Sequence, residues 1–133
     1  MAVPEVGVFP VHLTDTGRDE PIFTGLPDTL PVMQWHGVEA VALPAATTLL
    51  ATNDACYAQA IRVGKRAWGV QFHPEIDDGL LQFWMGDPVN RAAATAWLGS
   101  TQAADKFAAD GASQLPMAAR QSAALYTGLR AAV

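Results

Sequence analysis

A histidine and a carboxylate stand two residues apart at the end of an apolar, strand-like run. The run covers residues 67–72 and leads into His73, Pro74 and Glu75. Side chains two residues apart in an extended segment lie on the same face, so Glu75 can bind one ring nitrogen of His73 while the other faces a reacting group. This is the base and orienting carboxylate of a nucleophilic triad. The alternative is a His-Pro turn with an exposed carboxylate, and the spacing alone leaves both open.

The nucleophile of such a triad is not evident in these residues. Cys56 is the only cysteine of the chain. It lies in the stretch Asn-Asp-Ala-Cys-Tyr, which has no flanking glycine to permit the strained turn that presents a nucleophile. We therefore expect Cys56 to be a buried structural thiol.

Two further histidines could do chemistry. His36 follows Trp35 at the expected end of a strand, where it would line an active site or make an ordinary hydrogen bond. Glu39 is the first acidic residue after it. His12 falls inside an expected strand, and we predict a packed or surface side chain there.

A metal site can be drawn from the residues near His73, but its pattern is weak. The set would be His36, His73, Glu75, Asp77 and Asp78. Its spacing matches no established zinc pattern, and no cluster of cysteines supports it. Glycine-rich phosphate-binding patterns are also missing from the sequence. We predict no metal and no cofactor.

Strands are expected before residue 76 and helices after it. The strands should cover residues 6–13, 31–35, 47–51, 57–63 and 67–72. Gly64-Lys65 predicts a hairpin turn, and the short gap makes its two strands antiparallel. Residues 14–20, with Asp15, Asp19 and Glu20, read as a solvated polar loop.

The helices are predicted from their capping residues. Asp77 should cap a helix at 78–85, and Asp87 followed by Pro88 should begin a helix that reaches Leu98. A third helix should end near Gly111. A fourth should begin near Ser113, with a proline tolerated in its first turn.

Five segments resemble, in order, motifs of class I glutamine amidotransferases, most closely the glutaminase domain of guanosine monophosphate synthase. They are residues 5–14, 21–27, 32–37, 50–61 and 69–75. The resemblance implies an α/β fold, a three-layer α/β/α sandwich with a mixed sheet. It also implies that His73 and Glu75 match the histidine and glutamate of a Cys-His-Glu triad that hydrolyses glutamine. The alanine-rich tail resembles the tail of some of these proteins.

The sequence departs from this family at the nucleophile. The family cysteine lies in a Gly-x-Cys-x-Gly turn upstream of the segment that residues 5–14 resemble, and these residues contain no such turn. We expect residues 1–133 to form one partial domain, the C-terminal portion, with a strand-rich part (1–76) and a helical tail (77–133). This chain should be inactive on glutamine by itself. It should pair with the missing half or another chain, or self-associate through uncovered apolar strands.

Two other functions stay open at this point. One is a non-catalytic fragment that binds a partner, and the other is a γ-glutamyl peptidase-like hydrolase with the same triad. Composition narrows the rest: 50% of residues are hydrophobic and the net charge is −5, which disfavours nucleic-acid binding. No segment reads as a signal peptide or membrane span, and the single cysteine fits the reducing cytoplasm.

Overall fold

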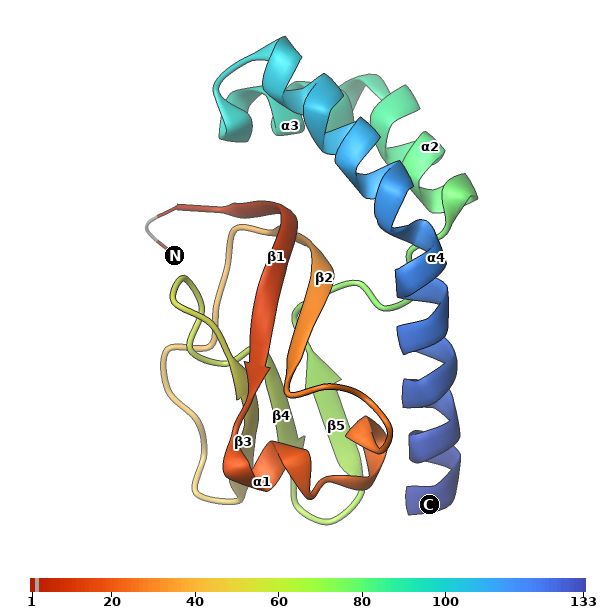
Figure 1. Cartoon of the computed structure of the whole chain (residues 1–133). Coiled ribbons are helices and arrows are strands. Elements are labelled where there is room, and N and C mark those ends of the chain that lie inside the picture. The colour runs from red at the N-terminus through yellow and green to blue at the C-terminus, as the bar shows by residue number, and fades with distance from the viewer. Residues whose placement is uncertain (2) are drawn as a thin grey trace.

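Five strands form one sheet in the computed structural model, which describes residue 1 and residues 3–133 (Figure 1). The strands are β1 (Glu5–Leu13), β2 (Thr29–His36), β3 (Thr47–Thr52), β4 (Ala60–Val63) and β5 (Ala67–Val70). Their order is β2-β1-β3-β4-β5, and each neighbouring pair is antiparallel. β2 and β5 are therefore the edges of the described sheet.

The predicted hairpin between the last two strands is confirmed. β4 and β5 pair from Ala60 with Val70 to Val63 with Ala67. Gly64 has φ of +60°, a backbone conformation that glycine adopts without strain. This tight turn brings the chain directly back along the sheet and ends β5 three residues before His73.

The two short helices begin where their capping residues predict. In α2 (Asp78–Gly86) the side chain of Asp77 accepts a hydrogen bond from the backbone of Leu80. In α3 (Pro88–Leu98) Asp87 accepts from two backbone N–H groups, and Gly99 with φ of +84° ends the helix. α2 therefore follows His73 at once and packs above it.

The prediction of two separate helices after residue 100 is wrong. One helix, α4, runs from Thr101–Ala132, with Gly111 and Pro116 inside it. A Cβ at Gly111 would lie 2.9 Å from Met33 Cε, so this glycine permits a close helix-to-sheet approach and does not end the helix. α4 bends about midway along its length (Figure 1), as expected where a proline removes a backbone donor.

The predicted polar loop at residues 14–20 is also wrong. It forms a helical turn, α1 (Asp15–Arg18), whose N-cap Thr14 accepts from the backbone of Gly17. A 3₁₀ helix, η1 (Pro21–Phe23), follows. Glu20 is buried and accepts hydrogen bonds from Arg62 Nε at 3.1 Å and Trp68 Nε1 at 2.8 Å, so tertiary partners retain a carboxylate where sequence suggested solvent.

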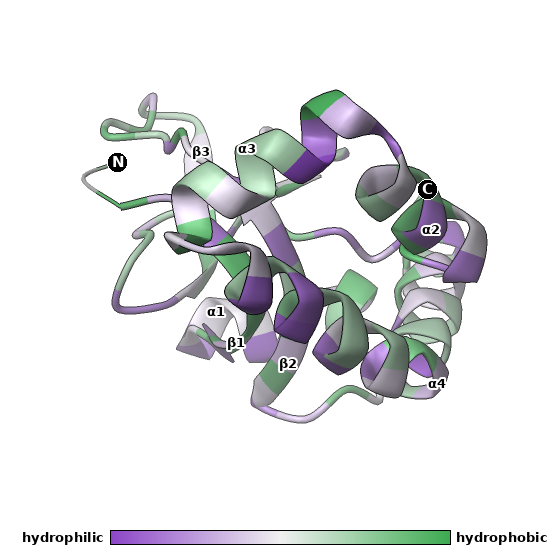
Figure 2. Cartoon of the chain, turned by 90° about the horizontal axis from the view of Figure 1, so that it is seen from above, coloured by the Kyte–Doolittle hydropathy of each residue, from purple (hydrophilic) through white to green (hydrophobic). Residues whose placement is uncertain are grey.

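Two apolar clusters lie on opposite sides of β1 and β2. One is enclosed by the curled sheet and centres on Val11, Leu30 and Leu50. The other lies under the helices and includes Met33 and Trp84. Figure 2 shows hydrophobic and hydrophilic residues alternating around α3 and α4, as expected for helices with one packed face. Across the described residues, none of the helices is both long and apolar enough to cross a membrane.

Gly17 provides a stability prediction. A Cβ there would lie 1.9 Å from the carbonyl oxygen of Leu50, a backbone atom that cannot move aside. Gly17→Ala should therefore destabilise the chain by about 3 kcal/mol. Urea unfolding followed by circular dichroism measures this. Gly86→Ala is the matched control, because a Cβ at this helical position meets no atom within 4 Å, and we expect a change of about 1 kcal/mol at most. Equal effects of the two substitutions would contradict the prediction.

Candidate active site

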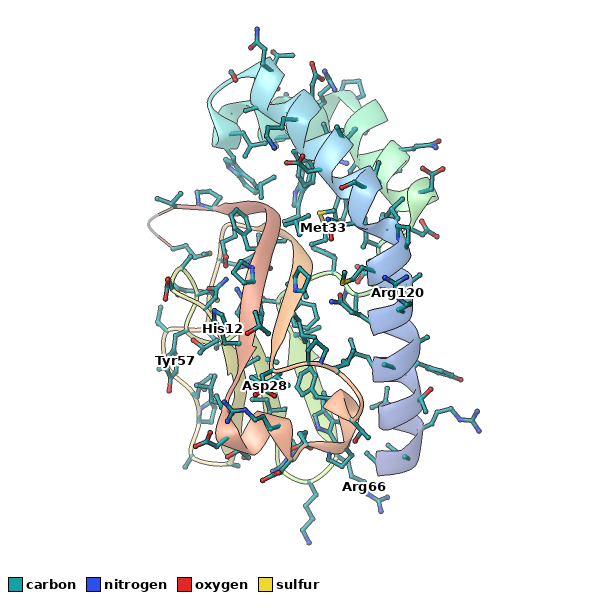
Figure 3. All side chains as sticks on the ribbon, in the orientation of Figure 1. His12, Asp28, Met33, Tyr57, Arg66 and Arg120 are labelled. Carbon is teal, nitrogen blue, oxygen red and sulfur yellow. The ribbon has the colours of Figure 1, made fainter. Side chains whose placement is uncertain are left out.

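The backbone of His73 is tied to the sheet. Its N–H donates to the carbonyl of Met33 on β2 at 2.9 Å. Met33 is labelled in Figure 3 where β2 meets the layer of helices. His73 is therefore fixed between the end of β5 and the helix that follows it.

The imidazole of His73 is held by the carboxylate that the sequence predicts. His73 Nδ1 lies 2.7 Å from Glu75 Oε1. A carboxylate only accepts, so Nδ1 carries a proton, and in the neutral ring Nε2 has a free lone pair. The side chain of His73 is 26% exposed and that of Glu75 is 57% exposed. This geometry is that of a base with an orienting partner, open on one side to a reacting group.

An aromatic side chain that sequence analysis did not single out supports the other face of the ring. Trp84 of α2 meets His73 edge to face, with centroids 4.8 Å apart and planes at 78°. Trp84 in turn packs on Trp35, 4.9 Å between centroids, and Trp35 on Phe107 at 5.5 Å. The only sequence signal for this contact was the position of Trp84 in a predicted helix soon after His73. The cluster limits the rotation of the imidazole.

Cys56 has the character of a structural thiol, as predicted. It is fully buried, and its backbone N–H donates to Asn53 Oδ1 at 2.7 Å. Burial raises the pKa of the Cys56 thiol, and the negative charge of Glu5 raises it further. A thiol with a raised pKa is poorly suited to act as a nucleophile at neutral pH.

His36 is buried, and its acidic partner is Glu5 rather than Glu39. His36 Nε2 lies 3.1 Å from Glu5 Oε2, and Nδ1 lies 2.9 Å from the carbonyl of Val38. The pairing follows from the register of the sheet, in which Glu5 of β1 is opposite His36 of β2. Glu5 is a buried polar residue that the sequence did not single out.

The remaining candidates are separate from His73. His12 on β1 (Figure 3) is exposed and shares a hydrogen bond of 3.0 Å with Thr29 Oγ1. Asp77 is occupied as the cap of α2. Among the described residues, the carboxylates near His73 do not gather with His36 into a group that could hold a metal ion.

An apolar cavity of about 510 Å³ opens between β5 and α4, next to the turn that carries His73. Its wall includes Trp68, Val70 and Pro74 on the sheet side and Leu125 on the helix side. This lining suits apolar side chains better than the polar amide of a small substrate.

Comparison with known proteins gives a consistent family. A model of the family described as "Glutamine amidotransferase class-I" matches residues 6–81. The chain is 44% identical over 62 residues to a glutamine-hydrolyzing GMP synthase of Syntrophomonas wolfei, covering 46% of this chain and 12% of that protein. It is 37% identical over 67 residues to a Methanoregula boonei protein named as one of the subunits of a glutamine-hydrolyzing GMP synthase, covering 50% of this chain and 36% of that protein.

Solved structures give the fold over nearly the whole chain. A glutamine amidotransferase of Thermotoga maritima has a TM-score of 0.70 at 24% identity, covering 96% of this chain and 50% of that one. A glutamine amido transferase of Methylobacillus flagellatus has a TM-score of 0.78 at 16% identity, covering 98% and 53%. The predicted α/β fold class is confirmed. The chain spans about half the length of these solved relatives, and less of the curated ones.

Proposed function

This chain belongs to the class I glutamine amidotransferase family, and from that premise we propose that His73 and Glu75 are the base and orienting residues of a triad that hydrolyses the side-chain amide of glutamine. The observation that carries the proposal is the contact of 2.7 Å between His73 Nδ1 and Glu75 Oε1, which leaves Nε2 free on the open side of the ring. The identity of the relatives as glutamine-hydrolysing proteins supports glutamine as the substrate.

The reaction proceeds through a thioester. His73 Nε2 takes the proton of a cysteine thiol, and the thiolate attacks the amide carbon of glutamine. The carbon–nitrogen bond breaks, and His73 returns the proton to the departing ammonia. His73 then takes a proton from water, whose oxygen attacks the thioester. Glutamate is released and the proton returns to the thiolate, so that the triad is regenerated.

The thiol comes from a segment outside these 133 residues. Cys56 is fully buried, with its ligand atom close to Glu5 and His36, and no other cysteine is present. The edge of β5 leads directly into the turn of His73, and an exposed strand edge offers backbone groups to which another strand can add. A nucleophile-bearing segment that adds along β5 would therefore arrive beside His73.

The ammonia passes to a partner that uses it. The Methanoregula boonei relative is named as one of several subunits, which supports a division between a glutamine-using chain and another polypeptide. Exposed Val63 and Val70 lie on β4 and β5, where a covering segment or a second copy of this chain would bury them.

The test compares the chain alone with the chain assembled with a segment that carries the Gly-x-Cys-x-Gly turn, joined to it or added in trans. Glutamate and ammonia release from glutamine is measured. We expect activity only in the assembly, and its loss when the added cysteine is replaced by alanine. Glutaminase activity of the chain alone that survives Cys56→Ala would contradict the proposal. Cleavage of γ-glutamyl peptides without free glutamine being hydrolysed would favour a peptidase, and tight assembly without either activity would favour a partner-binding module.

A further inference from the structure

A second cluster of reactive groups lies apart from His73 and plays no part in the proposed reaction. Glu5 begins β1, His36 ends β2, and Cys56 lies in the loop before β4. One carboxylate oxygen, one ring nitrogen and the sulfur all lie within 4.8 Å of one another. The three residues are 4%, 8% and 0% exposed. We propose that Glu5, His36 and Cys56 bind a divalent transition-metal ion, with zinc the best fit.

Hydrogen-bond accounting at His36 points to a cation. The carbonyl of Val38 only accepts, so His36 Nδ1 carries the proton that it shares at 2.9 Å. In the neutral ring, Nε2 then presents a lone pair toward Glu5 Oε2, 3.1 Å away. Nε2 is buried and makes no hydrogen bond of acceptable angle. Two facing lone pairs repel, whereas a shared metal ion would satisfy both.

The contacts around the cluster are those that hold metal ligands in place. A ligating histidine commonly donates its second ring N–H to a backbone carbonyl, as His36 does to Val38. The carboxylate of Glu5 is fixed by two amides, Asn53 Nδ2 at 2.7 Å and Gln59 Nε2 at 2.8 Å. Both amide donors leave lone pairs on the carboxylate oxygens free for an ion.

The donor set and its spacing fit zinc. Zinc is bound by sulfur, imidazole nitrogen and carboxylate oxygen at about 2.0 to 2.3 Å in a tetrahedral arrangement. Two such ligands lie about 3.3 Å apart by this geometry, close to the 3.1 Å between His36 Nε2 and Glu5 Oε2. Cys56 would bind as thiolate, its proton being released to solvent, and water would complete the tetrahedron. A cavity of about 280 Å³, lined partly by Glu5 and Asn53, gives the ion a route from solvent.

Such an ion would join three strand ends next to the candidate active site. The carbonyl of Val38, which accepts from His36, also accepts from Gln71 Nε2 at 2.9 Å. Gln71 lies two residues before His73. The ion would therefore steady the turn after β2 and, through Gln71, the approach to His73, without touching the reacting atoms.

Cobalt substitution tests the site in the wild-type chain. The full chain is stripped with a chelator under reducing conditions and titrated with Co²⁺ alone. We expect one Co²⁺ per chain, an ultraviolet thiolate-to-cobalt band, tetrahedral bands in the visible region, and stoichiometric displacement by Zn²⁺. Absence of the thiolate band at millimolar Co²⁺ would overturn the proposal, and this result needs no variant to fold.

Matched histidine substitutions locate the ion. His36→Gln should weaken Zn²⁺ affinity at least about 100-fold, because it removes a ligand and not merely an outer contact. His12→Gln makes the same change at an exposed site and should leave the affinity within about twofold. Circular dichroism confirms that each variant is folded. Binding that is unchanged in folded His36→Gln but lost in His73→Gln would place the ion elsewhere and overturn the assignment.

Discussion

His73→Ala should lower the turnover of glutamine by the assembled enzyme by about 10⁴- to 10⁶-fold, the range seen when the base of a triad is removed. The reason is the position of Nε2, which is the free base on the open side of the ring while Nδ1 is held by Glu75. Without it, the thiol has no acceptor for its proton and ammonia has no donor. The loss should appear in kcat, with KM changed little, since the imidazole acts in the transition state. Steady-state release of glutamate measures both constants.

The control for this prediction is His12→Ala. It removes the same side chain from an exposed position that touches only Thr29 among its hydrogen-bond partners. Turnover should stay within about twofold and unfolding should change by less than about 0.5 kcal/mol. A loss of less than tenfold in folded His73→Ala would show that another group is the base.

The pairing of His73 with Glu75 could be predicted because it is local. Two residues separate the side chains, and the extended backbone fixes their common face. The burial of Cys56 was also predictable, since its flanking residues lack the glycines of a nucleophile turn. Both inferences needed only the conformation of a short segment.

The partners of buried polar groups could not be predicted because they come from distant segments. Glu5 meets His36 only because β1 and β2 pair in one particular register. Glu20 is buried because Arg62 and Trp68 reach it from the β4–β5 hairpin. A sequence pattern gives the face of a strand but not which residue of another strand lies opposite.

The continuity of α4 was missed for a related reason. Gly111 and Pro116 are local signals for a helix end, and both are usually reliable. Here the space above Met33 and Leu81 accepts only a residue without a side chain, so Gly111 sits inside a packed helix. Burial of the helix face against the sheet outweighs the local cost of both residues.

Glu75→Gln should lower kcat of the assembled enzyme by about 10² to 10³-fold, less than His73→Ala. A carboxylate at 2.7 Å keeps the proton on His73 Nδ1. A glutamine can instead donate to Nδ1, which moves the proton to Nε2 and leaves no base facing the thiol. A buried carboxylate in this role is worth about 10⁴. Glu75 is 57% exposed, so water competes for the ring nitrogen and the effect should be smaller. Glu39→Gln is the matched control, since its carboxylate does not contact His73, and turnover should not change.

A double-substitution cycle separates orientation from a general electrostatic effect. If Glu75 acts only through the imidazole, it has nothing to orient once His73 is alanine. The double variant should then be no slower than His73→Ala alone, since groups that act as a unit are strongly non-additive. An additional loss of about 10²-fold in the double variant would mean that the carboxylate acts on the substrate or the thiol directly. The Trp84 contact predicts the first result, because it holds the ring in the one orientation in which Nδ1 meets Glu75.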